Sequence, residues 1–194
     1  MIQIVGGKFR SQKLEVPTGR NTRPTQSKLR ETIFNTLQAE VLESKVLDLY
    51  SGSGALGFEA ISRGADYVVF VENASSAIGA IKKNIDSLQV KEKCRLLAYP
   101  VERVWTKLEA DSPFDLVFAD PPYRFGKDMD FLREAPWSTL LTSDGKVLVE
   151  WSPESKTDCY LDENYGPLIK IREKKYGDTV LTTFQKRKNA QVGG

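Results

Sequence analysis

The sequence predicts an α/β fold in which helices cover both faces of a mostly parallel sheet. Three observations predict it. Apolar segments at 46–50, 67–71 and 115–119 have the character of buried strands, and helical patterns lie between them. A glycine-rich stretch at 52–57 directly follows the first of these strands. The 194 residues suffice for one compact domain with a full core.

The first part of the chain predicts a short strand and one long helix. Residues 2–5 alternate apolar and polar side chains and reach Gly6-Gly7, which indicates a strand and a turn. A basic, turn-rich stretch follows as far as Arg23. Apolar residues at helical spacing then predict an amphipathic helix over 26–43, with Thr25 as its N-cap.

From residue 46 onwards, strands and helices alternate. The expected strands are 46–50, 67–71, 95–98, 115–119 and 146–151. The expected helices are 55–63, 74–88, 101–109 and a stretch near 128–141. The end of the chain differs, because 168–175 and 180–185 flank a Gly177-Asp178 turn. These two segments predict an antiparallel hairpin that closes the sheet.

Composition excludes several kinds of chemistry. The chain has no histidine, which excludes Ser-His and Cys-His pairs and histidine-ligated zinc. Its two cysteines, Cys94 and Cys159, are too few for a disulfide framework or a four-thiolate metal site, and we expect no metal. The longest apolar run is about five residues, far below the ~20 that cross a membrane, and the N-terminus lacks the pattern of a signal peptide. We therefore expect a soluble, cytoplasmic protein without a membrane partner.

Charge is strongly segregated behind a net value of +2. Residues 1–30 hold seven basic residues and one acidic residue, and residues 170–194 hold seven basic and two acidic. The centre, 31–169, is acidic overall. Basic surfaces attract polyanions such as nucleic acids, although basic ends can also serve solubility alone.

The glycine-rich stretch indicates a nucleoside ligand. Gly52, Gly54 and Gly57 match G-x-G-x-x-G between a strand and a helix, and Glu72 ends the next strand 20 residues after Gly52. Such glycines allow a tight turn and a close ligand, and the acid can accept hydrogen bonds from ribose hydroxyls. Asp48 precedes the loop, where it would repel the pyrophosphate of a dinucleotide. Its carboxylate suits the ammonium and sulfonium of S-adenosylmethionine, the alternative being an acid that only caps the loop.

A second motif, Asp120-Pro121-Pro122-Tyr123, follows the strand at 115–119. The two prolines stiffen the turn and remove two N–H donors. The Asp120 carboxylate and the Pro121 carbonyl are then acceptors for an exocyclic amino group, and Tyr123 can stack on a planar base. An ordinary capped Pro-Pro turn is the alternative, which the nearby glycine loop disfavours.

These two motifs resemble those of class I S-adenosylmethionine-dependent methyltransferases that act on amino groups. The match is closer to the bacterial 16S ribosomal RNA (guanine-N2)-methyltransferase family of RsmD type, over about residues 2–186. The residues that carry it are Ile4–Arg10, Lys13–Pro17, Arg23–Thr25, Arg30–Asn35, Asp48–Glu59, Asp120–Tyr123 and Tyr176–Thr179. The resemblance implies a Rossmann-like, seven-stranded sheet with one reversed strand and methyl transfer to N2 of a guanine in small-subunit ribosomal RNA.

The resemblance also implies a division of the chain and a set of site residues. Residues 1–24 would form a basic hairpin extension that grips RNA, 25–188 the methyltransferase domain, and 189–194 a flexible tail. Apart from the resemblance, we expect a monomer. The expected catalytic residues are Asp120, Pro121, Pro122 and Tyr123. The expected cofactor-binding residues are Asp48, Tyr50, Ser51, Gly52, Ser53, Gly54, Gly57, Glu72, Asn73 and Val101. The expected RNA-binding residues are Arg10, Lys13, Arg20, Arg23, Thr25, Lys28 and Arg30.

The chain departs from the family pattern at two places. Ser27-Lys28 stands where members commonly carry Asp-Arg. Ala98-Tyr99-Pro100-Val101 stands where an acid usually faces the adenine, so the adenine contact stays unassigned. Three alternatives remain open at this point: an adenine or cytosine amino-methyltransferase of DNA or RNA, a nicotinamide-dependent oxidoreductase, and a non-catalytic RNA-binding protein.

Overall fold

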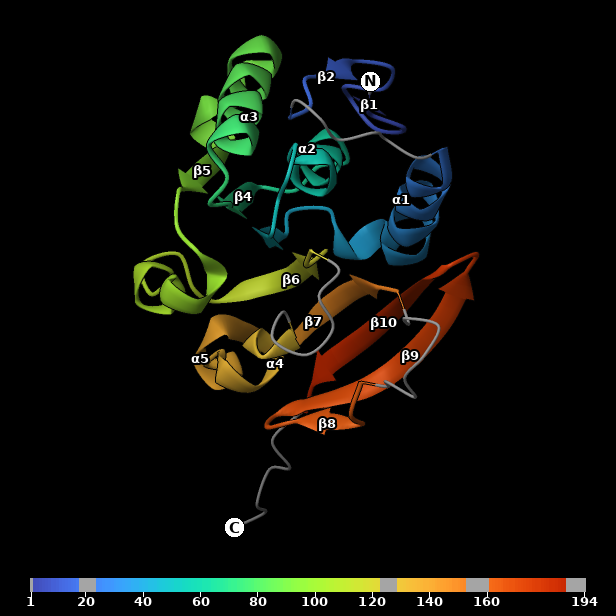
Figure 1. The fold of residues 1–194 in the computed structure, drawn as a ribbon, viewed down its shortest axis with the longest axis vertical. Coiled ribbons are helices and arrows are strands. Elements are labelled where there is room, and N and C mark those ends of the chain that lie inside the picture. The colour runs from blue at the N-terminus through green and yellow to red at the C-terminus, as the bar shows by residue number, and fades with distance from the viewer. Residues whose placement is uncertain (1, 18–23, 123–128, 153–160, 188–194) are drawn as a thin grey trace.

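The computed structural model describes residues 2–17, 24–122, 129–152 and 161–187, and has the expected α/β architecture (Figure 1). Its main sheet has eight strands in the order β5-β4-β3-β6-β7-β10-β9-β8. They are β3 (Lys45–Leu49), β4 (Tyr67–Val71), β5 (Cys94–Leu97), β6 (Phe114–Ala119), β7 (Leu141–Trp151), β8 (Asn164–Tyr165), β9 (Leu168–Tyr176) and β10 (Thr179–Lys186).

Strand direction confirms the predicted topology. β5, β4, β3, β6 and β7 pair in parallel, and β10 pairs antiparallel with both β7 and β9. Among the seven longer strands β10 is therefore the reversed one. The two-residue β8 extends the edge beyond β9 and has no counterpart in the sequence prediction, because two residues carry no periodic signal.

Alternate residues of the central strands enter two separate cores. Val46, Phe118 and Leu148 pack with α1 (Pro24–Leu37), α2 (Ala55–Ser62) and α3 (Ser75–Leu88) on one face. Leu47, Val117 and Val149 pack on the opposite face with α4 (Phe131–Glu134), α5 (Trp137–Leu140) and two 3-10 turns, Val101–Arg103 and Trp105–Lys107. Side chains alternate along a strand, so even-numbered positions on β3, β6 and β7 face α1 and α2.

Three of the predicted helices are corrected by the structure. The helix over 26–43 ends at Leu37 and continues as a 3-10 turn, Gln38–Glu40, since Gln38 takes a positive φ of 32°. The segment 101–109 forms two 3-10 turns, whose period also brings residues three apart to one face. Within the described part of 128–141, Pro136 lacks an N–H and separates α4 from α5.

The predicted N-terminal hairpin is present as β1 (Ile2–Gln3) paired with β2 (Lys13–Leu14). Its backbone is fixed to the end of α2: Val5 N–H donates to Glu59 Oε2 (2.8 Å) and Phe9 N–H to Ser62 Oγ (2.8 Å). Figure 1 shows the hairpin beside α2 and near the start of α1. Because α1 begins at Pro24, Thr25 lies inside the helix, and its prediction as the N-cap is wrong.

No helix in the described ranges is long and apolar enough to cross a membrane.

Candidate functional site

The site lies where the order of strands reverses. Chain connections run from β3 outward through β4 to β5 on one side, and from β6 to β7 on the other. Loops that leave the carboxyl ends of β3 and β6 therefore diverge and leave a crevice, the usual ligand position in such sheets. Leu49 and Ala119 pair in register at these ends, so the glycine loop and Asp120 start side by side.

The glycine loop has the backbone that its sequence requires. Gly52 and Gly54 have φ of 57° and 77°, in the left-handed region that glycine adopts without strain. Gly57 packs α2 against β4, since a Cβ there would lie 2.2 Å from the Phe70 ring. Tyr50 also has a positive φ, of 56°, and its ring meets the Phe131 ring edge-on at 5.8 Å.

Asp48 is buried under this loop, with only 2% of its surface exposed. Its Oδ2 accepts the Gly57 N–H at 3.0 Å, so it does hold the start of α2. Burial raises the pKa of Asp48 well above its usual range; the Gly57 N–H opposes this rise, and the nearby Asp120 and Glu72 add to it. A cationic ligand group would favour the ionised carboxylate, so the capping contact is compatible with the predicted role.

Glu72 connects the glycine loop to the loop after β4. Its Oε2 accepts the Gly52 N–H (2.8 Å), and its Oε1 accepts the N–H groups of Asn73 (2.8 Å) and Ala74 (2.9 Å). An ionised carboxylate offers about four lone-pair positions, so acceptor capacity remains for ribose hydroxyls. Asn73 is exposed, and the predicted cofactor contact stays a prediction.

Ser51 and Ser53 tie the loop to its surroundings. Ser51 Oγ donates to Asp48 O (2.6 Å) and accepts the Val71 N–H (3.0 Å), which joins β3 to β4. Ser53 O accepts from Asn84 Nδ2 (3.1 Å). Asn84 is fully buried on α3 and was missed by the sequence analysis, although a polar residue between Ile81 and Ile85 on an apolar face is a detectable signal.

The other predicted ligand residues are distributed around the crevice. Pro121 is buried, Pro122 is exposed and Asp120 is half-buried, while Tyr123 lies outside the described residues. Val101 is the first residue of the 3-10 turn Val101–Arg103 and is buried in the core, with 3% of its surface exposed. Its side chain can therefore contribute only an apolar wall.

A second buried acid, missed by the sequence analysis, lies beside Asp120. Glu150 is near the carboxyl end of β7 and only 8% exposed. Burial and the charge of Asp120 raise the pKa of Glu150 to about 8, and Arg30 on α1 opposes that rise. A charged residue inside the apolar run 147–151 was the available signal, since ions in buried strands are rare.

The predicted RNA contacts divide into surface and interior positions. Arg10, Lys13 and Lys28 are exposed. Arg20 and Arg23 lie outside the described residues, and the position of the Thr25 side chain is likewise not described. Arg30 is buried, with 5% exposed, where it donates to Gln3 O (2.6 Å) and lies 3.6 Å from Glu59. This position fits an anchor for the hairpin and does not fit a phosphate contact.

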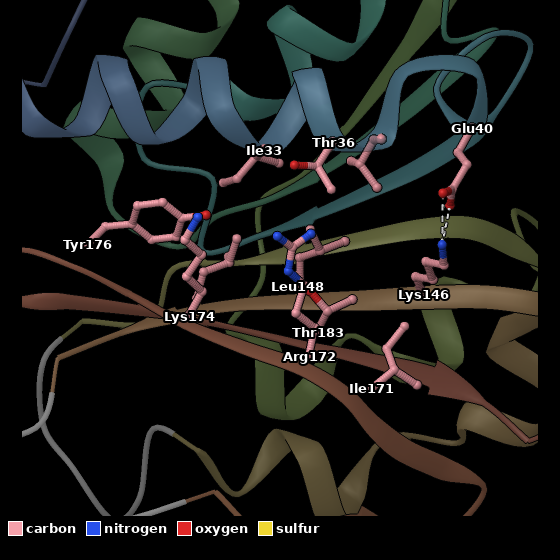
Figure 2. A pocket seen from close by; sticks show the side chains of 12 residues that line it. Ile33, Thr36, Glu40, Lys146, Leu148, Ile171, Arg172, Lys174, Tyr176 and Thr183 are labelled. Carbon is pink, nitrogen blue, oxygen red and sulfur yellow. Dashed lines mark hydrogen bonds and ion pairs between the residues drawn. The ribbon is translucent and has the colours of Figure 1, made fainter.

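A groove runs between α1 and the strands β7, β10 and β9 (Figure 2). Ile33, Leu37, Leu148 and Leu181 form its apolar lining. In Figure 2, Glu40 pairs with Lys146 at one end, and Lys174 and Tyr176 lie toward the other.

The Tyr176–Thr179 motif of the resemblance is the turn of the β9–β10 hairpin. Because Val180 pairs with Trp151, the last residue of β7, this turn lies at the same end of the strands as Asp120.

Comparison with known proteins decides the family. The family model described as Conserved hypothetical protein 95 matches residues 2–185. The chain belongs to this family. Ribosomal RNA small subunit methyltransferase D of Escherichia coli (strain K12) is 32% identical over 157 residues, which cover 79% of this chain and 76% of that protein. The protein of the same name from Buchnera aphidicola subsp. Acyrthosiphon pisum is 34% identical over 145 residues, 70% of this chain and 72% of that protein.

A solved structure agrees with these relatives. The yhhF protein of Escherichia coli has a TM-score of 0.78 at 30% identity, covering 97% of this chain and 99% of its own. The chain is thus a member of an RsmD-type methyltransferase family, which confirms the resemblance and leaves the oxidoreductase alternative without support.

Proposed function

We propose that this protein transfers a methyl group from S-adenosylmethionine to N2 of a guanine in small-subunit ribosomal RNA. The observation that carries the proposal is the juxtaposition of two loops. The glycine loop over Asp48 and the Asp120-Pro121-Pro122 turn leave paired, adjacent strands at one crevice. One loop suits a nucleoside cofactor and the other an exocyclic amino group, and the names of the relatives support ribosomal RNA as the substrate.

The cofactor residues fit S-adenosylmethionine by their chemistry. Glu72 would accept hydrogen bonds from the ribose hydroxyls, and Asp48 would favour the ligand's positive charges. Left-handed Gly52 and Gly54 let the backbone approach the ligand closely. When bound, S-adenosylmethionine supplies an electrophilic methyl group, whose S–C bond breaks as the new N–C bond forms.

The base residues would activate a weak nucleophile. The lone pair of the guanine amine is delocalised into the ring. Asp120 and the Pro121 carbonyl would accept its two N–H bonds, which favours a pyramidal nitrogen with its lone pair directed at the methyl group. Tyr123 would stack on the base, and Asp120 would receive the proton that the methylated nitrogen releases. This is catalysis by positioning and electrostatics.

The surface residues would bind RNA. We propose that the hairpin, through Arg10 and Lys13, and the start of α1, through Thr25 and Lys28, contact phosphates. Arg20 and Arg23 would add contacts from the segment between them. The division into a 1–24 extension, a 25–188 catalytic domain and a 189–194 tail belongs to this proposal. So do the monomeric state and the cytoplasmic location.

The test is methyl transfer from labelled S-adenosylmethionine to small subunits, and separately to naked RNA, from cells that lack the modification. Nucleoside mass spectrometry then identifies the product, and digestion maps its position. N2-methylguanosine is the expected result. N6-methyladenosine or N4-methylcytidine would establish one of the amino-methyltransferase alternatives, and RNA binding without transfer would establish the non-catalytic one.

A further inference from the structure

Asp120 directly follows β6, and Glu150 is the last residue but one of the neighbouring strand β7. β6 and β7 are parallel and pair Ala119 with Val149, so Asp120 and Glu150 are the next residues along the two chain segments. Phe118 and Leu148, two residues earlier, both belong to the core on the α1 face. By strand alternation Asp120 and Glu150 point to that same face, on strands about 4.8 Å apart. The charge of Asp120 helps to raise the pKa of Glu150, which agrees with this closeness.

Glu150 is only 8% exposed, and no residue in the described part of the chain donates a hydrogen bond to its carboxyl, whose oxygens keep some access to solvent. The nearest opposite charge is Arg30 on α1, but that guanidinium bonds Gln3 O and lies against Glu59. Opposite Glu150 on β10 is Leu181, which offers no side-chain donor. The carboxyl therefore keeps acceptor positions that a ligand bringing an N–H donor can occupy.

Guanine brings such a donor next to its amino group. Its N1–H lies beside the N2 amino group on the same edge of the ring. Adenine and cytosine place a ring nitrogen with a lone pair beside their amino groups, and that lone pair would face a carboxylate oxygen. A second acceptor beside Asp120 therefore distinguishes guanine from the other two amino-bearing bases.

We propose that Glu150 determines base specificity by accepting the N1–H of the target guanine while Asp120 holds the N2 amino group. The inference rests on the proposed function and names the residue that selects the base. It predicts that a substrate with an N2 amino group but no N1–H is a poor one. Because the pKa of Glu150 is about 8, the carboxyl discriminates against adenine and cytosine only when it is ionised, and the incoming N1–H of guanine favours that form.

The test uses small-subunit RNA assembled by splinted ligation, with one of three bases at the mapped nucleotide. Guanine has both N–H groups, and 2,6-diaminopurine keeps the N2 amino group but has a lone pair at N1. The third base, 6-thioguanine, keeps N1–H and the N2 amino group and replaces the oxygen at position 6 by sulfur, so it controls for loss of that oxygen. Wild-type protein should have kcat/KM about ten- to a hundred-fold higher for guanine than for 2,6-diaminopurine, as expected for one charge-assisted hydrogen bond. 6-Thioguanine should behave like guanine.

The Glu150→Gln variant sharpens the test. Its amide can accept from N1–H through oxygen and donate to a bare N1 through nitrogen, so the preference should fall to within about threefold. The matched control is Glu163→Gln, which changes an exposed acid directly before the edge strand β8. This variant should keep the wild-type ratio of kcat/KM for guanine to that for 2,6-diaminopurine. A ratio of two substrates is insensitive to a partial loss of folded protein.

Two results would overturn the inference. Equal methylation of guanine and 2,6-diaminopurine by the wild type would show that N1–H is not read, even if Glu150→Gln fails to fold. An unchanged preference in folded Glu150→Gln would assign the reading to another group. Failure of the proposed function is distinct, because then the mapping experiment yields no N2-methylguanosine at all.

Discussion

Two pairs of carboxylates, Asp48 with Glu72 and Asp120 with Glu150, lie at the carboxyl ends of the parallel strands. The pairs differ in the hydrogen-bond donors that their oxygens have. On the cofactor side, Asp48 and Glu72 accept N–H groups from Gly52, Gly57 and the turn after β4. On the base side, Glu150 has no donor from the described residues. The comparison teaches that burial alone does not define a role. In the proposed function, the first pair shapes a loop that would receive the cofactor, and Glu150 would keep its acceptor capacity for the substrate.

The largest effect should come from the base side. Asp120→Ala removes a positioned charged acceptor at the reacting amine, so single-turnover methyl transfer should fall by about a hundred-fold or more. The measurement uses saturating cofactor and RNA, so that only the chemical step is compared. A variant that turns over at a near-normal rate would remove Asp120 from the mechanism.

The cofactor side should respond differently. Glu72→Ala loses the ribose acceptor and also the bonds that join Gly52 to the turn after β4, so the KM for S-adenosylmethionine should rise about ten- to a hundred-fold. The rise in Tm on adding a fixed concentration of S-adenosylmethionine should shrink with it. RNA binding without cofactor is the control and should not change. An unaltered KM would exclude Glu72 from the cofactor site.

Replacing exposed cations outside both carboxylate pairs should leave cofactor binding and methyl transfer unchanged. Arg10→Ala/Lys13→Ala removes two exposed cations of the hairpin, which should weaken RNA binding several-fold and reduce the log–log salt slope by about 0.7–0.9 for each phosphate contact. The KM for RNA should rise while kcat stays constant. Lys82→Ala/Lys83→Ala, two exposed lysines on α3, is the charge-matched control. Equal effects of the two double variants would mean that net charge, and not the hairpin, binds RNA.

The smallest effect concerns stability and pH. Burial and Asp120 raise the pKa of Glu150 to about 8 from an ordinary 4.5, against the opposing Arg30. The folded state therefore keeps a proton that the unfolded state loses, and this group lowers stability as pH rises from about 4.5 through 8. Glu150→Gln does not titrate, so its Tm relative to wild type should be a few degrees higher at pH 9 than at pH 5. A Tm difference that is the same at both pH values would place the Glu150 pKa near its ordinary value.

The sequence predicts the parts of this protein that depend on local pattern. β4 has the predicted bounds, Tyr67–Val71, because a short β-branched run between a glycine and a helix start permits little else. Likewise, the glycines and Glu72 meet as expected, since their spacing follows from one strand–helix–strand unit. The helix predicted at 101–109 is wrong because apolar spacing does not distinguish 3-10 turns from an α-helix. The helix predicted near 128–141 is wrong because Pro136 interrupts the pattern.

Residues joined only by tertiary structure could not be found in this way. Asn84 holds the glycine loop from 31 residues away, and Arg30 is drawn inside by Gln3 and Glu59. Glu150 lies beside Asp120 only because of the register of β7 against β6. A strand prediction gives neither the neighbour nor the register, so a lone acid at a strand end is not recognisable as part of a site.

The division between the two carboxylate pairs is tested most directly by calorimetric titration of S-adenosylmethionine into two conservative variants, Glu72→Gln and Asp120→Asn. The account predicts that Glu72→Gln weakens cofactor binding by about tenfold or more and that Asp120→Asn leaves it within about threefold of wild type. Equal losses of affinity in both variants, or a larger loss in Asp120→Asn, would contradict it.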